Sequence, residues 1–157
     1  MNKARAWWAM AVFAALMVLH APARAATFRL DDAGSHPVPP NVQMQWRSLG
    51  AGVAGRARQM EAQINVAIRL DTRAHAGRRA RIFMVLPQDG GAPLVAQWGT
   101  QGRMLSGRIA LGERTLVYQG LIPDGTLEDR FQLYLLTDGE WMGTSRRLEF
   151  YFELETP

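Results

Sequence analysis

The chain contains 157 residues, and its 18 basic and 14 acidic side chains give a formal net charge of +4. The absence of cysteine excludes disulfide bonds, thiol nucleophiles and lipidation at a cysteine. Without residues 1–25, 15 arginines stand against 14 acidic residues, so the net charge falls to +1. Nucleic-acid binding needs a large uncompensated basic surface, and this class of function is therefore not favoured.

Residues 1–25 have the pattern of a secretory signal peptide. Lys3 and Arg5 form a positive segment, an apolar run follows at residues 9–19, and Ala23 and Ala25 occupy the cleavage-site positions. The apolar run is shorter than the ~20 residues that span a bilayer, which favours cleavage over a permanent anchor. We therefore expect an exported mature chain, residues 26–157, without a transmembrane span and located in the periplasm or at the cell surface.

The mature chain shows strand patterns separated by turn signals. Apolar and polar residues alternate over residues 62–71, and Leu148, Phe150, Phe152 and Leu154 alternate with polar residues in the last segment. Proline, glycine and aspartate mark the turns, as in residues 88–91 and 123–125. In chain order, the expected strands are 27–30, 42–47, 60–71, 80–87, 93–99, 103–111, 114–122, 130–136 and 147–155.

This organisation predicts an all-β fold. No mature segment sustains the apolar spacing of an amphipathic helix. About 7–9 strands in one domain-sized chain predict a single antiparallel β-sandwich, immunoglobulin-like, over residues 26–157. A closed β-barrel is the alternative. A membrane barrel is disfavoured, because its outer face should be continuously apolar between aromatic girdles.

Arginines gather after the strand that ends near residue 71. The loop and its exit contain Arg73, His75, Arg78, Arg79 and Arg81. The planar guanidinium group suits bidentate recognition of a carboxylate or a phosphate. The loop is therefore a candidate binding site for an anionic partner; the alternative is a solvated loop whose charges pair with acidic residues of the same chain.

The C-terminal region offers two further candidates. Trp141 follows a turn, where an exposed indole would anchor a partner. The last strand, with Leu148, Phe150, Phe152 and Leu154, would add to the sheet of a partner unless it is paired on both sides.

Catalytic and metal-binding patterns are weak. The mature chain has two histidines, His36 and His75, without the spacing of a metal site, and no serine stands in a nucleophile motif. Glu149, Glu153 and Glu155 share one face of the last strand. They favour a solvated face, with a carboxylate-dependent hydrolase as a remote alternative. No catalytic residue, metal or cofactor is assigned.

These patterns favour an exported, non-enzymatic binding or assembly protein of the bacterial envelope, such as an accessory or appendage-associated subunit. Its partner would be another envelope protein or an anionic surface component. The alternative is a periplasmic protein that binds a small ligand or a metal.

Overall fold

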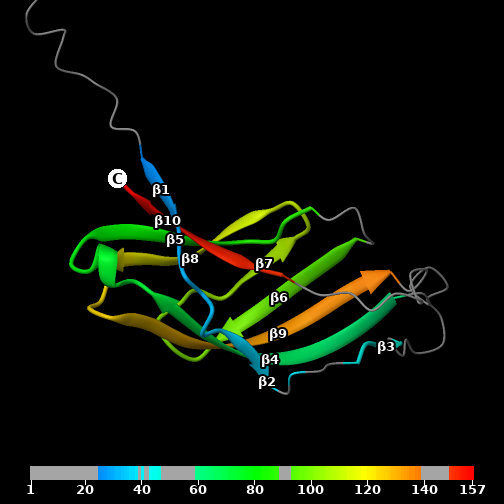
Figure 1. Cartoon of the computed structure of the whole chain (residues 1–157). Helices are drawn as coiled ribbons and strands as arrows, with labels where there is room; N and C mark the ends of the chain where they lie inside the picture. The colour runs from blue at the N-terminus through cyan, green and yellow to red at the C-terminus, as the bar shows by residue number, and fades with distance from the viewer. Residues whose placement is uncertain (1–24, 39, 41–42, 47–58, 89–92, 139–148) are drawn as a thin grey trace, which may run out of the picture.

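The computed structural model describes residues 25–38, 40, 43–46, 59–88, 93–138 and 149–157 (Figure 1). These residues form β-strands and one short 3₁₀ helix, η1 (Arg73–His75). Sheet A contains, in spatial order, β1 (Ala26–Arg29), β10 (Tyr151–Thr156), β5 (Arg79–Val85) and β8 (Arg114–Leu121). Sheet B contains, in spatial order, β2 (His36–Val38), β4 (Gln59–Asp71), β9 (Thr126–Asp138), β6 (Leu94–Thr100) and β7 (Gly107–Ala110), and β3 (Gln45–Trp46) also pairs with β4.

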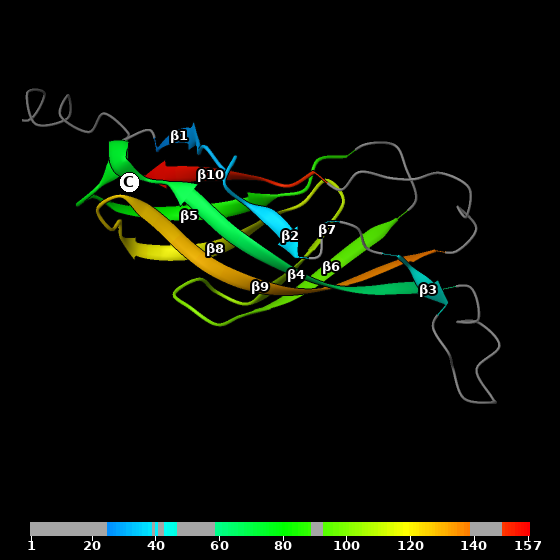
Figure 2. The same ribbon diagram turned by 60° about the horizontal axis from the view of Figure 1, so that its bottom comes forward.

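The two antiparallel sheets pack face to face (Figure 2). Within the described residues, sheet A ends at β1 and β8, and sheet B ends at β7 and at the short strands beside β4. The predicted β-sandwich is therefore confirmed, and the closed barrel is wrong. Each sheet keeps one face for the core and one for solvent, which explains the alternation in the sequence.

The middle of the chain crosses between the sheets as in an immunoglobulin domain. β5 pairs with β8 in sheet A, and β6 pairs with β9 in sheet B. The outer strands are exchanged relative to the immunoglobulin order, in which each outer strand pairs with its neighbour in sequence. Here β4, which precedes β5, pairs with β9, whereas β10, which follows β9, pairs with β5.

The core consists of the inward side chains of both sheets. In β4 the even-numbered residues face inward, and Leu70 is fully buried. In β9 the odd-numbered residues from Leu127 to Leu135 do so. Ile82 of β5 and Leu154 of β10 meet them from sheet A and are also fully buried. Burying each such side chain stabilises the fold by about 1.5–3 kcal/mol.

The strands on either side of the arginine loop do not pair with each other. β4 belongs to sheet B and β5 to sheet A, so the loop is a crossover between layers. Thr72 opens this crossover and is completely buried. Its amide and its hydroxyl both donate to the carbonyl of Gly125, at 3.1 and 3.0 Å, which ties the crossover to the turn between β8 and β9.

Two predicted strands are shorter than the sequence suggests. β7 begins only at Gly107, because residues 101–106 form a loop around Asp129. β3 is two residues long, and its Trp46 is 50% exposed. Figure 1 shows β3 at the far end of sheet B, beyond the strands of sheet A that would cover it.

Candidate binding face on sheet B

The predicted arginine loop lies at one end of the sandwich, where η1 joins β4 to β5 (Figure 1). Arg73 donates from Nε and Nη2 to the carboxylate oxygens of Asp71, at 3.0 and 2.5 Å. These side-chain hydrogen bonds lower the pKa of Asp71 from its ordinary 3.8 to about 2. The Arg73 guanidinium is thus already occupied by a carboxylate of its own chain.

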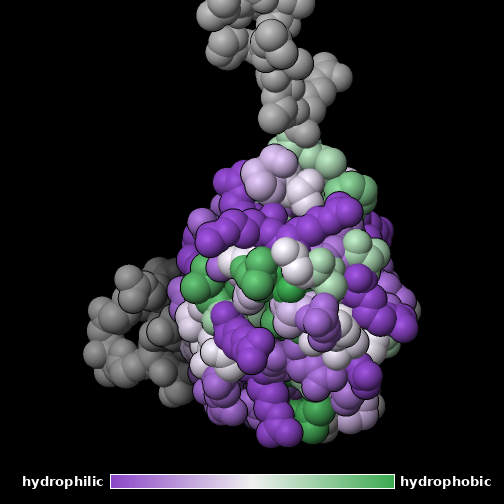
Figure 3. Space-filling model, turned by 90° about the vertical axis from the view of Figure 1, so that its left-hand side faces the viewer, coloured by the Kyte–Doolittle hydropathy of each residue, from purple (hydrophilic) through white to green (hydrophobic). Residues whose placement is uncertain are grey.

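The other loop residues have different surroundings. The ring of His75 is half-buried and lies 4.8 Å from that of Phe28, so it packs β1 against the loop. Arg78 and Arg79 are exposed, and neither forms an ion pair within the described residues. Figure 3 looks onto this end of the molecule, where hydrophilic residues surround small hydrophobic patches. Arg78 and Arg79 are the part of the predicted anion site that a partner could still reach.

Arg81 lies on the outer face of sheet A rather than in the loop. Its Nη2 donates to Oε2 of Glu155 at 3.1 Å. Arg114 on the neighbouring β8 lies 2.7 Å from the other oxygen of Glu155 and 3.0 Å from Glu153. The Arg114 guanidinium also stands 3.6 Å from the centre of the Phe83 ring. Charge pairs and a cation–π contact therefore join β10, β5 and β8 across this face.

The last strand is an interior strand of sheet A. β10 pairs with β1 on one side and with β5 on the other, so it has no free edge while β1 is in place. Its Phe152 and Leu154 are buried, and Phe150 packs partly buried against the core. The structure therefore assigns these three side chains to packing. Trp141 and Leu148, the other candidates in this region, lie outside the described residues.

The carboxylates of the last strand lie on a sheet face and bond to arginines. Glu153 and Glu155 both contact Arg114 and do not line either hollow described below. His36 lies in β2 and His75 in η1. Within the described part of the chain, no three His, Asp or Glu side chains come together as a metal site would require. These arrangements therefore do not support the carboxylate-dependent hydrolase or the metal-binding protein that the sequence analysis gave as alternatives.

The outer face of sheet B carries a polar row that crosses four strands. The register pairs Gln63 with Tyr134, Tyr134 with Gln97, and Gln97 with Arg108. Adjacent strands are ~4.8 Å apart, so the row is roughly 14 Å long. The Tyr134 hydroxyl donates to the carboxylate of Glu61 on β4. Two amides, a phenol and one cation thus stand side by side on a single face.

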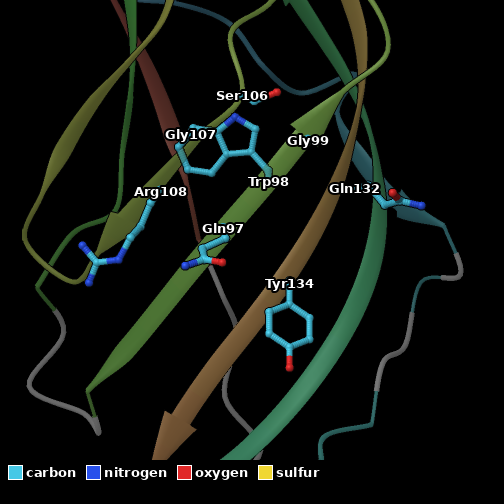
Figure 4. Close-up of a pocket in the computed structure, with 8 residues that line it drawn as sticks. All are labelled: Gln97, Trp98, Gly99, Ser106, Gly107, Arg108, Gln132 and Tyr134. Carbon is cyan, nitrogen blue, oxygen red and sulfur yellow. The ribbon is translucent and has the colours of Figure 1, made fainter.

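A hollow of about 480 Å³ opens along this row. Gln132, in the next row, pairs with Gly99, whose missing side chain leaves the surface open there. The polar lining consists of Gln97, Ser106, Arg108, Gln132 and Tyr134, and the remaining lining is Trp98, Gly99 and Gly107. Figure 4 shows the Gln97 amide extending toward Arg108, and the Tyr134 ring on β9.

A smaller hollow, of about 180 Å³, also includes Tyr134 in its lining. It is lined by Gln43, Gln45, Glu61, Ala62, Gln63 and Tyr134. Tyr134 therefore belongs to both hollows, with amide side chains in each. The two hollows form one polar surface on the outer face of sheet B, which we call the amide face.

The loop of residues 101–106 carries Ser106, which lines the larger hollow. The Met104 amide donates to Oδ2 of the buried Asp129 at 2.8 Å. The indole N–H of Trp98 donates to the carbonyl of Leu105 at 2.9 Å. These bonds anchor the loop that carries Ser106 to buried residues of the core.

The sequence contains a signal for this face, but alternation alone could not identify it. Gln63, Gln97 and Gln132 each stand between inward apolar residues, which places them on the outer face of some sheet. That they share one sheet, in adjacent strands, follows only from the pairing of β4, β9 and β6.

Comparisons with known proteins give no counterpart for this chain. No family model, no curated protein and no solved structure matches it. The side chains on the two sheets are therefore the basis for the function proposed next.

Proposed function

We propose that this protein is an exported, non-enzymatic binding protein of the bacterial envelope, and that it binds through the amide face. The observation that carries the proposal is the row from Gln63 to Arg108, in register across four strands beside a shallow, open hollow. Ligand sites hold a few convergent polar groups, and the side chains of Gln97, Arg108 and Gln132 supply such groups here.

The envelope location rests on the sequence. Residues 1–25 have the n-region, apolar run and cleavage site of an exported protein. Among the described residues, no helix is long and apolar enough to cross a membrane. We expect mature protein starting at Ala26 in the envelope fraction, measured by N-terminal sequencing. An intact N-terminus on protein from the cytoplasmic fraction would contradict export.

The binding role is tested by capture from an envelope extract. The mature chain is immobilised, and captured protein and polysaccharide are both quantified. The amide-face variant combines Gln97→Ala, Arg108→Ala and Gln132→Ala, and we expect it to lose the captured material. The matched control combines Thr27→Ala, Arg29→Ala and Gln119→Ala on sheet A and should capture as much as the wild type. Equal capture by both variants would overturn the proposed face.

A second candidate surface is the pair Arg78 and Arg79, which have no ion-pair partner within the described residues. Two neighbouring guanidinium groups suit an anionic surface component. The double variant Arg78→Ala/Arg79→Ala, in the same capture experiment, separates this surface from the amide face. If it retains all captured material, these arginines are a solvated loop tip.

A further inference from the structure

The larger hollow owes its shape to a glycine that the fold does not require. Gly99 lies in β6, and a Cβ atom added there would meet nothing within 4 Å. Its φ angle is not in the left-handed region that favours glycine. Glycine inside a strand costs about 0.5–1 kcal/mol relative to alanine. Packing and backbone geometry therefore give no reason for glycine at this position.

Gly107, on the opposite side of the hollow, provides the contrast. A Cβ atom at Gly107 would lie 2.8 Å from Cζ2 of Trp98, so this glycine is explained by close packing. At Gly99 no neighbour fills the space beside the backbone, so a group from outside can approach it closely, which is a known role of glycine within strands.

The lining selects a ligand that is neutral and rich in hydroxyl groups. The amides of Gln97 and Gln132 each supply two donors and an acceptor, and the Ser106 hydroxyl supplies both functions. A sugar hydroxyl also donates and accepts, so it can pair with each of these groups. Among the described lining residues, the larger hollow has one basic side chain, Arg108, and the smaller hollow has one acidic side chain, Glu61, so the face has no excess positive charge for holding a polyanion.

Tyr134 and the second hollow point to a chain of sugar rings. Tyr134 contributes apolar ring surface to the larger hollow, against which the C–H groups of a sugar can lie, whereas the Trp98 ring is buried and stacks on Phe131 in the core. Tyr134 lines both hollows, and the smaller one adds the amides of Gln43, Gln45 and Gln63. A linear ligand passing over Tyr134 would place polar groups in both hollows.

We propose that the amide face binds a neutral oligosaccharide, with one sugar ring seated in the hollow over Gly99. This inference rests on the proposed binding function and names the ligand class.

The test uses the mature chain and a panel of neutral oligosaccharides built from glucose, mannose, galactose or N-acetylglucosamine. Polygalacturonate and a neutral peptide serve as comparison ligands. We expect at least one neutral oligosaccharide to shift the NMR signals of the Gln97 and Gln132 side-chain amides and of the Gly99 backbone amide. Shifts produced only by polygalacturonate or only by the peptide would overturn the inference, and so would no shifts at all.

Filling the hollow gives the second measurement. Gly99→Phe should weaken binding of the active oligosaccharide by about tenfold or more, because the ring would occupy the sugar's space. Gln119→Phe places the same side chain on the outer face of sheet A and should leave the affinity unchanged. Gln97→Ala/Gln132→Ala, which keeps Gly99, covers the case in which Gly99→Phe does not fold. If a folded Gly99→Phe variant or this double variant bound the oligosaccharide as tightly as the wild type, the proposed position of the sugar ring over Gly99 would be wrong.

Different experimental results would contradict the proposed binding face and the proposed oligosaccharide ligand. If capture from the envelope extract depends on the amide face but no neutral oligosaccharide binds, the glycan inference is wrong and the binding face stands. If capture does not depend on that face, the proposed function itself is wrong.

Discussion

The outer face of sheet A and the polar row on sheet B use their side chains in different ways. On sheet A, Arg81 and Arg114 meet Glu153 and Glu155 across three strands, and Arg114 covers the ring of Phe83. On sheet B, the side chains of the row are mostly uncharged. Within the described residues, the side chains of Gln97, Gln132 and Arg108 make no hydrogen bond or ion pair with the rest of the chain.

This difference is the basis for placing the proposed binding surface on sheet B rather than on sheet A. Charged groups on sheet A satisfy one another, so a ligand there would have to break existing pairs. Amides on sheet B keep their hydrogen-bonding capacity for water or a ligand. The cost of replacing water is therefore lower on sheet B, and the hollow adds shape to that face.

The largest expected effect comes from the buried group that supports sheet B. Asp129→Ala removes the acceptor of the Met104 amide and should lower the free energy of unfolding by about 1.5–3 kcal/mol. Denaturant unfolding measures this loss, and hydrogen exchange at Met104 should accelerate. Glu128→Ala is the control, because its exposed pair with Arg69 contributes at most about 1 kcal/mol. If the Met104 amide of the Asp129→Ala variant exchanged at the wild-type rate, the structure of the loop of residues 101–106 would not depend on this carboxylate.

The next effect compares one arginine from each face. Arg114→Ala removes two carboxylate contacts and the stacking on Phe83, and should cost about 1–2 kcal/mol of stability. Arg108→Ala, in the edge strand β7, should change stability by less than about 0.5 kcal/mol. Thermal and denaturant unfolding of both variants give the comparison. Equal losses would mean that the two faces do not differ in the way described.

A smaller effect, of opposite sign, is expected at the two glycines of the hollow. Gly99→Ala should raise the free energy of unfolding by about 0.5–1 kcal/mol, because it restricts the unfolded chain and meets no neighbour. Gly107→Ala should lower it, because the new methyl group would press on Trp98. If Gly99→Ala is destabilising, the glycine has a structural role and the case for ligand approach weakens.

The smallest effect is local and depends on pH. Asp71 has its pKa lowered to about 2 by the hydrogen bonds from Arg73. The pair therefore contributes stability that is present above the ordinary pKa and is lost as the pH falls through about 2. Arg73→Gln should return the titration midpoint of Asp71 toward 3.8, followed by the NMR signal of its carboxyl carbon. An unchanged midpoint would exclude Arg73 as the cause.

Much of the fold could be predicted from the sequence, whereas the candidate site could not. The strand pattern led to the sandwich and to the inward residues of β4 and β10. The arginine loop was identified by its density of charge, but Arg73 and Arg81 turned out to pair within the chain. The last strand was predicted to pair with a partner sheet if one of its edges is free. In the structure that edge is already paired within the chain, because β1 lies along one side of β10.

Alternation along a strand predicts which side of that strand a residue occupies. A strand has a period of two, so Gln63, Gln97 and Gln132 face outward whatever the pairing is. Tertiary structure decided which strands are neighbours, and hence that these amides form one surface around Tyr134. The physical reason is that alternation is local along the chain, whereas pairing joins residues far apart in sequence, such as Gln63 and Tyr134.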